Sequence, residues 1–136
     1  MLISRETDYT LRVLRGLSSG KKMTADDLCQ QELLPKPFTY KILKRLERAG
    51  FVETQRGAEG GFRLSTDLKK VTLYDFIETM DVDRLVGSCL EPDFECEWQR
   101  KYGSSCMVHK QLKEIQEILD GKLRELSLHK VIFGCD

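Results

Sequence analysis

Apolar residues recur at helical spacing in several stretches of this chain, and the intervals between them predict its elements. In residues 4–20, Val13, Leu14 and Leu17 fall on one face of a helix, and Ser4 stands where an N-cap is expected. The cationic face of the same helix is left to solvent or to a partner. We therefore expect the chain to open with an amphipathic helix.

The next two stretches predict two short helices separated by a tight joint. Residues 24–34 begin with Thr24 and Asp27 at capping-box spacing, and Pro35 stops that helix. Pro37 presets the first turn of the helix that follows. Two short helices joined in this way are typical of a helix-turn-helix. The apolar face expected for the second helix consists of Phe38, Ile42, Leu43 and Leu46.

The period of the pattern changes after the second of these helices. Residues 51–65 indicate two short strands joined by the turn RGAEGG, whose glycines adopt positive backbone angles freely. Residues 72–81 return to helical spacing, with Thr72 and Asp75 as a second pair at capping-box spacing. A helix-turn-helix followed by a hairpin predicts a mainly α-helical, winged helix-turn-helix domain over residues 1–81.

The last part of the chain combines an irregular loop with a long helix. Periodicity disappears over residues 82–104 and returns from residue 105 onward. One stripe of the helix carries more leucine and isoleucine than a small domain covers by itself, which favours pairing with a second copy. We expect residues 105–136 to form a dimerisation helix and tail within the same structural unit. The stripe consists of Leu112, Ile115, Leu119, Leu123 and Leu126.

Charge is balanced overall but unevenly distributed. The chain has 22 basic and 22 acidic residues, so its formal net charge is zero. Residues 35–63 hold seven basic and three acidic side chains, whereas residues 75–97 hold eight acidic side chains and a single basic one, Arg84. Segments of opposite sign predict a basic working face that is separate from an acidic region.

The sequence does not suggest export or membrane insertion. Arg5, Glu6 and Asp8 interrupt the N-terminus where a signal peptide needs an apolar run, and no stretch approaches the roughly 20 apolar residues of a membrane span. We therefore expect a cytoplasmic protein. In a reducing cytosol, an odd number of cysteines with three close together favours metal binding or thiol reactivity over disulfides.

The basic helix and the hairpin together predict a surface for DNA. Outward cations on a helix suit phosphate and base-edge contacts in a major groove, and Arg56 at the hairpin tip suits a narrow minor groove. Each feature alone fits an ordinary solvated surface, whereas their succession favours DNA. A homodimer presents two such helices about a two-fold axis, so we expect a roughly palindromic, double-stranded operator. The candidate contacts are Lys36, Thr39, Tyr40, Lys41, Lys44, Arg45, Arg48, Arg56 and Arg63.

The stretch CLEPDFECEWQRKYGSSCMVH, residues 89–109, holds three cysteines and a histidine. Cys106 and His109 lie on the first turn of the long helix at a spacing that projects both side chains to the same side. The helix N-terminus favours a thiolate at Cys106. Cys89 and Cys96 lie on a loop that can fold over to meet them. This donor set predicts a zinc site or an iron-sulfur cluster, and the absence of C-x-x-C knuckles favours the cluster.

The remaining cysteines and the enzyme alternative are weaker candidates. Cys29 is expected to be a small buried residue and Cys135 a free thiol near the chain end. A nucleophilic Cys106 with His109 as its base lacks an evident orienting group and substrate pocket. We therefore do not expect an enzyme. The alternatives with the same fold are a regulator with structural zinc and one with redox-active thiols and no cluster.

The order of helix-turn-helix, glycine-bearing wing, three-cysteine loop and long helix resembles the IscR/NsrR-type iron-sulfur regulators of the Rrf2 family. The resemblance covers nearly the whole chain and is most specific in TDYTLRVL (7–14), RGAEGGFRLS (56–65) and CMVH (106–109). It implies a dimeric winged helix transcription regulator, expected to be a repressor. Its cluster would report nitric oxide, redox state or iron-sulfur supply.

The resemblance also implies a ligand set for the cluster. Cys89, Cys96 and Cys106 would be three ligands, although the interval between the second and third is longer than is usual in the family. The fourth ligand would be His109, as in IscR-like members with two-iron clusters, or Asp8 of the partner subunit, as in NsrR-like members with four-iron clusters. This sequence contains both residues, so both ligand sets stay open.

Overall fold

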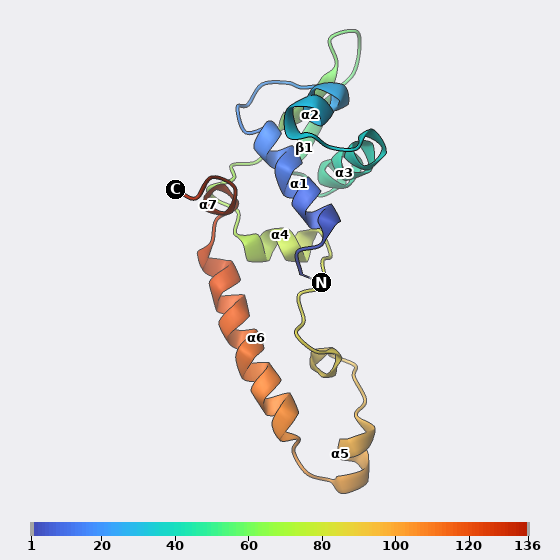
Figure 1. Cartoon of the computed structure of the whole chain (residues 1–136), viewed down its shortest axis with the longest axis vertical. Coiled ribbons are helices and arrows are strands. Elements are labelled where there is room, and N and C mark those ends of the chain that lie inside the picture. Colours follow the sequence, from blue (N-terminus) through green and yellow to red (C-terminus); the bar gives the residue numbers. More distant parts are fainter. Residues whose placement is uncertain (1, 136) are drawn as a thin grey trace.

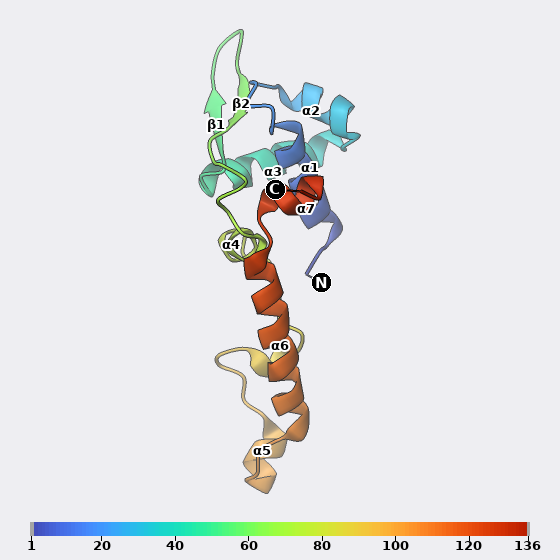
Figure 2. The ribbon, with the colours of Figure 1, turned by 90° about the vertical axis from the view of Figure 1, so that its left-hand side faces the viewer.

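The structure, a computed structural model, describes residues 2–135. A body of packed helices carries a projecting hairpin at one end, and a single long helix extends from the other end of the body toward a small helical tip (Figure 1; Figure 2). In chain order the elements are α1 (Arg5–Gly16), α2 (Ala25–Glu32), α3 (Lys36–Arg48), β1 (Val52–Gln55), β2 (Gly61–Leu64), α4 (Leu73–Thr79), the 3-10 turn η1 (Ser88–Leu90), α5 (Glu97–Tyr102), α6 (Met107–Glu125) and α7 (Leu128–Phe133).

Three of the helices have side-chain caps at the N-terminal residues that the sequence predicts. The Ser4 hydroxyl accepts a backbone N–H at the start of α1. Thr24 and Asp27 form a complete capping box on α2, and Thr72 and Asp75 form another on α4. Each such cap satisfies N–H groups that have no partner within the helix and contributes about 1 kcal/mol.

The core lies between α1, α2, α3, α4 and the hairpin, and it also receives side chains from α6 and α7. Its centre is formed by the helical faces that the apolar spacing predicts, including Leu14 and Leu17 of α1 and Phe76 and Ile77 of α4. Other buried members are Val13, Leu28, Ile42, Leu43, Leu46, Phe51, Val52, Phe62, Leu68, Leu73, Met80, Leu123 and Leu128.

The hairpin is antiparallel, with Val52 opposite Leu64 and Gln55 opposite Gly61. Met23, ahead of α2, extends it through an isolated bridge to Phe62, with N···O distances of 2.7 and 2.9 Å. This bridge fixes the base of the hairpin to the body. The predicted class, mainly helical with a small β-hairpin wing, is confirmed.

The C-terminal region, expected to be one long helix and a tail, forms two helices, α6 and α7. Helix α6 ends at Glu125, and the chain then turns so that α7 packs on α1 and α4, with Leu128 completely buried. Two backbone hydrogen bonds hold the turn: Leu73 N–H donates to the Leu126 carbonyl at 2.7 Å, and Leu128 N–H donates to the Val71 carbonyl at 2.8 Å. Helix α7 is therefore part of the body.

Two other expectations differ in detail. The region 82–104, expected to be irregular, contains η1 and α5. Phe38, expected in the core, is 49% exposed. Its ring makes an edge-to-face contact with the ring of Tyr9, with ring centroids 6.2 Å apart. In the part of the chain that the structure describes, no helix is long and apolar enough to cross a membrane.

Candidate DNA interface and cysteine-bearing segment

The joint between α2 and α3 positions the basic helix. Leu33, the C-cap of α2, adopts left-handed angles of φ 54° and ψ 54°. Pro35 is the N-cap of α3, and Pro37 lies in its first turn, where a missing N–H costs no helical hydrogen bond. Ile42 and Leu46 are buried on the inner side of α3. The other side of the helix therefore faces solvent.

Several predicted DNA contacts lie on that solvent-facing side. Tyr40, Lys41, Lys44 and Arg48 are exposed. Lys44 lies 3.9 Å from the Glu47 carboxylate, a loose surface pair. A pair of this kind contributes little to stability, so the lysine can exchange it for a phosphate.

Lys36 and Thr39, also predicted as contacts, have partners within the chain. The Lys36 ammonium lies 2.9 Å from the Asp26 carboxylate, and the hydrogen bond and charge of Asp26 raise the pKa of Lys36. Thr39 is completely buried, and its hydroxyl donates to the Pro35 carbonyl at 3.0 Å. The structure therefore leaves Lys36 at the surface as a paired cation, whereas Thr39 is part of the core.

Arg45 ties the basic helix to its neighbours. Its guanidinium pairs with the Glu6 carboxylate of α1 and donates to the Met80 carbonyl at the end of α4 at 2.7 Å. Its side chain is half-exposed, so these bonds compete with any contact to DNA. In this conformation Arg45 orients α3 against α1 and α4.

The hairpin tip presents Arg56 on a glycine-bearing turn. Arg56 is exposed and is followed by Gly57 at φ +110°, in the region that favours glycine. A Cβ at Gly60 would lie 2.5 Å from the Gln55 carbonyl oxygen, so the turn closes only around a glycine. Arg63, exposed on β2, lies opposite Glu53 of β1 and not at the tip.

The cysteine-bearing segment, residues 84–109, runs from the end of the α4 region to the start of α6. Cys89 lies in η1, Cys96 is the N-cap of α5, and Cys106 is the N-cap of α6. All three are free and partly buried. Within residues 2–135, no group of three or more cysteine, histidine, aspartate or glutamate side chains is close enough together to hold a metal ion.

One cavity brings two of the predicted ligands together. Cys89 and His109 both line a cavity of about 380 Å³ between the segment and α6, whereas Cys96 and Cys106 are not among its lining residues. A Cβ at Gly87 would lie 3.0 Å from Leu112 Cδ1. This glycine therefore permits the close approach of the segment to α6 immediately before Cys89.

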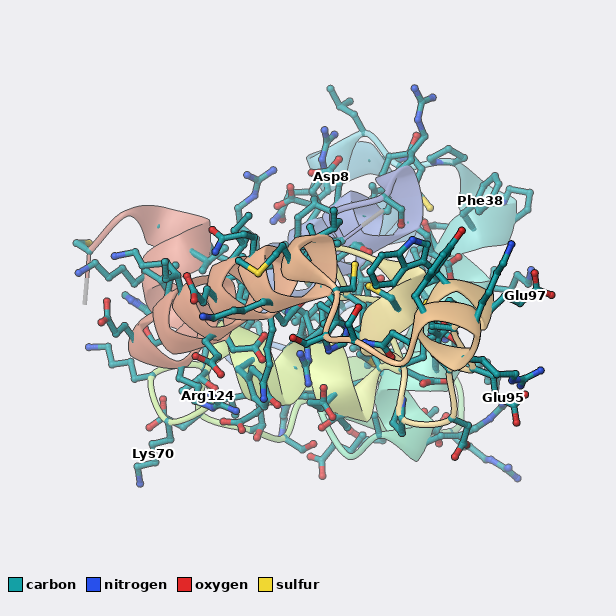
Figure 3. The ribbon with its side chains drawn as sticks, turned by 90° about the horizontal axis from the view of Figure 1, so that it is seen from below. Asp8, Phe38, Lys70, Glu95, Glu97 and Arg124 are labelled. Carbon is teal, nitrogen blue, oxygen red and sulfur yellow. The ribbon has the colours of Figure 1, made fainter. Side chains whose placement is uncertain are left out.

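Asp8 lies apart from this segment within one chain. It belongs to α1 and forms a 3.0 Å ion pair with Arg12. Figure 3 shows Asp8 on the α1 ribbon, away from Glu97 of α5, whose side chain points outward. The two further cysteines differ in exposure: Cys29 is only partly buried on α2, and Cys135 is exposed.

Arg84, at the start of the segment, is the centre of a polar network that the sequence did not reveal. Its side chain is 19% exposed, and its guanidinium donates to Glu78 at 2.7 Å, to both oxygens of Asp120 at 2.9 Å, and to the Tyr74 hydroxyl at 3.0 Å. Burial lowers the pKa of Arg84, but the hydrogen bond to Glu78 and the charge of Asp120 outweigh this effect. The pKa of Arg84 is therefore raised above its ordinary value. The sequence offered one signal for this role: Arg84 is the single basic residue among eight acidic residues in the stretch 75–97.

Gln116 of α6 completes this network. It is 7% exposed; its carbonyl oxygen accepts the Val86 N–H at 2.9 Å, and its amide nitrogen lies 3.3 Å from the Arg84 carbonyl and 2.8 Å from Asp120. One side chain thus bonds the backbone of the segment on both sides of Leu85.

Comparison with known proteins assigns the chain to a family. The sequence profile of the Rrf2 family, described as "Iron-dependent Transcriptional regulator", matches residues 3–133. "Protein aau3" of Rhizobium meliloti is 29% identical over 124 residues, which cover 89% of this chain and 80% of that protein. The HTH-type transcriptional regulator NsrR of Bacillus licheniformis is 27% identical over 100% of this chain and 95% of its own length.

Solved structures of similar fold cover the whole chain. CymR (YrzC), described as the global cysteine regulator of B. subtilis, has a TM-score of 0.72 and 21% identity, with coverage of 100% of this chain and 99% of CymR. T. potens IscR has a TM-score of 0.67 and 14% identity, with coverage of 100% and 89%. The chain therefore belongs to the Rrf2 family and is a DNA-binding transcription regulator of the winged helix type, not an enzyme.

Proposed function

We propose that this protein is a cytoplasmic, homodimeric repressor that binds a roughly palindromic operator and senses its signal through the cysteine-bearing segment. The observation that carries the DNA part is the exposed row of cations on α3, next to a hairpin with Arg56 in its turn. A second copy related by a two-fold axis would present a second α3 to the next half-site.

The contacts divide between two grooves. Lys41, Lys44 and Arg48 on α3 are suited to phosphates and base edges of the major groove, with the exposed Tyr40 beside them. Arg56 reaches from the hairpin tip toward the minor groove, where a guanidinium reads a narrow, A·T-rich segment. Lys36 and Arg63 flank these groups. Arg45 joins the interface only by leaving Glu6 and Met80, and the buried Thr39 supports α3 from inside.

Loss of one phosphate contact tests this surface. Lys44→Ala should weaken binding and reduce the slope of log affinity against log salt by about one, because one fewer counterion is released. The measurement is fluorescence anisotropy with a palindromic duplex selected from random DNA. Lys122→Ala is the matched control, since Lys122 also forms a pair three residues along its helix, with Glu125, but lies on α6. An unchanged slope for Lys44→Ala would remove this side chain from the interface.

An iron-sulfur cluster held by Cys89, Cys96 and Cys106 is the proposed sensing group. Its support is the donor chemistry, because three free, partly buried thiols in one segment are the soft ligands that such clusters use. The described chain does not gather them, so binding requires closure of the segment or completion of the site by a second chain. When bound, the cluster supplies a centre sensitive to nitric oxide, oxidants or iron-sulfur supply.

The two candidates for the fourth ligand come from different chains. His109 lines the same cavity as Cys89, which supports a site contained in one chain and a two-iron cluster. Asp8 of the partner subunit would serve a site shared between chains and a four-iron cluster. A shared site requires Asp8 to exchange its ion pair with Arg12 for the metal.

A second candidate is the same regulator with no cluster, sensing through bare thiols or holding structural zinc. The observation that favours the thiol form is the separation of the cysteines, all of which are free and none of which is fully buried, whereas a zinc site needs the same closure of the segment as the cluster. The fold likeness to CymR, described as a cysteine regulator, is compatible with this alternative.

A further inference from the structure

The beginning of the cysteine-bearing segment is held to two helices by one side chain. Arg84 uses all three guanidinium nitrogens: Nε on Glu78, Nη1 on Asp120 and Nη2 on the Tyr74 hydroxyl. Tyr74 and Glu78 belong to α4, which packs in the body, whereas Asp120 belongs to α6, which carries the segment away from the body (Figure 1). Arg84 therefore connects the two parts of the molecule.

The aromatic ring of Tyr74 strengthens this junction. The Arg84 guanidinium carbon lies 4.8 Å from the Tyr74 ring centroid, and that of Arg124 lies 3.9 Å from the same centroid. Both cations are thus placed on one ring of α4. The junction remains assembled only while α6 keeps its present position against α4.

The same network reaches the cysteine cavity. Arg84, Gln116 and Asp120 line the cavity that contains Cys89 and His109. Gln116 holds the Val86 N–H at 2.9 Å, three residues before Cys89. Any movement of Cys89 away from α6 therefore pulls on a backbone that Gln116 and Arg84 hold.

We propose that Arg84 is the positioning residue that couples the cysteine-bearing segment to the winged helix domain. Displacement of the segment breaks the bonds of Gln116 and Arg84, which frees α4 from α6 and alters the support that α4 gives to α3 through the Met80 carbonyl and Arg45. This inference rests on the proposed function, in which the segment senses the signal.

A lysine cannot replace this arginine, because an ammonium on a single stem cannot contact Tyr74, Glu78 and Asp120 at once in the planar geometry that a guanidinium offers. Arg84→Lys therefore keeps the charge and removes the coupling. Arg100→Lys is the matched control, because Arg100 pairs with Glu95 within the segment, where both side chains are exposed.

Amide hydrogen exchange tests the coupling without a ligand. In Arg84→Lys, exchange at Val86 and at Glu78 should become about tenfold faster relative to the Leu14 amide in the core of α1, whereas Arg100→Lys should leave both ratios unchanged. Faster exchange at Val86 alone, at neither amide, or equally in the control would overturn the coupling.

Operator binding tests the consequence for sensing. The probe is protein reconstituted anaerobically with ferrous iron and sulfide, and the readout is the ratio of operator affinities with and without iron. Arg84→Lys should bring this ratio to within about twofold of one, with iron content close to wild type. A wild-type ratio in the variant would overturn the inference. If the wild-type protein shows no iron-dependent ratio, the proposed sensing function fails, while the exchange measurement still decides the coupling.

Discussion

Leu33, at the joint between α2 and α3, has an unfavourable backbone conformation for a leucine. Its angles of φ 54° and ψ 54° lie in the left-handed region, where a Cβ costs about 1–2 kcal/mol. The residue is 82% exposed, so burial does not offset this cost. The N–H of Leu33 still donates to the Cys29 carbonyl, so the conformation serves to close α2 before α3 begins.

Replacement of Leu33 by glycine should stabilise the protein. Glycine adopts the left-handed region without a Cβ penalty but loses more freedom on folding, so the expected gain in the free energy of unfolding is about 0.5–1 kcal/mol. Urea unfolding of Leu33→Gly measures it. Leu33→Ala is the control: it removes the exposed side chain but retains the Cβ and should gain little. Equal stabilisation by alanine would contradict the backbone argument.

Helix α6 is covered along only part of its length. Leu123 near its C-terminal end is buried in the body, whereas Met107, Val108, Ile115 and Ile118 are exposed. An exposed apolar stripe on a helix that leaves the body is typical of a surface that pairs with another chain. Of the predicted stripe only Ile115 is exposed, because Leu119, Leu123 and Leu126 pack against the core of the same chain. The surface available for the proposed dimer is therefore the stripe of Met107, Val108, Ile115 and Ile118.

A charge placed on the exposed stripe should separate the proposed dimer. Ile118 is 74% exposed, so Ile118→Asp should change the free energy of unfolding of a single chain by no more than about 0.5 kcal/mol. In a dimer the same carboxylate would be buried without a partner and would shift the equilibrium to monomer. Sedimentation equilibrium measures the mass. Ile118→Leu, which remains apolar, should stay dimeric, and a dimeric Ile118→Asp protein would exclude this stripe from the interface.

The molecule as a whole places the cysteine-bearing segment far from the proposed DNA surface. Helix α6 holds the segment away from the body, and the hairpin projects from the opposite end (Figure 1; Figure 2). A signal at the cysteines therefore has to pass through α6 and the body to reach α3. This arrangement is why the junction at Arg84, where the segment, α4 and α6 meet, matters for the proposed function.

Replacement of single cysteines tests whether the whole protein holds a cluster. Cys96→Ala should abolish iron and sulfide retention after anaerobic reconstitution, because a cluster in this segment loses one of its thiolate ligands. Cys29→Ala and Cys135→Ala are the controls, since these thiols lie on α2 and at the chain end, and both variants should retain iron as wild type does. Unchanged iron content in Cys96→Ala would contradict Cys96 as a ligand, whereas a wild-type protein that retains no iron would favour the thiol or zinc alternative.

Local interactions made much of the fold predictable from the sequence. The caps at Ser4, Thr24 and Thr72 join residues three apart, so their pattern is visible in the chain itself. The same holds for the glycines of the wing and for the apolar faces of α1, α3 and α4. The exposed lysines of α3 followed from that pattern, because the side opposite a buried face is open to solvent.

Only the tertiary structure decided which distant groups meet. Arg84 and Asp120 are 36 residues apart, and Arg45 and Glu6 are 39 apart, so no spacing rule predicts either pair. The burial of Leu128 likewise depends on the turn after α6, which brings α7 back to the body. The sequence by itself determined the elements from α1 to α4 and the donor chemistry of the cysteines, since these depend on neighbouring residues. Their separation, the cavity shared by Cys89 and His109, and the junction at Arg84 depend on how the finished elements pack.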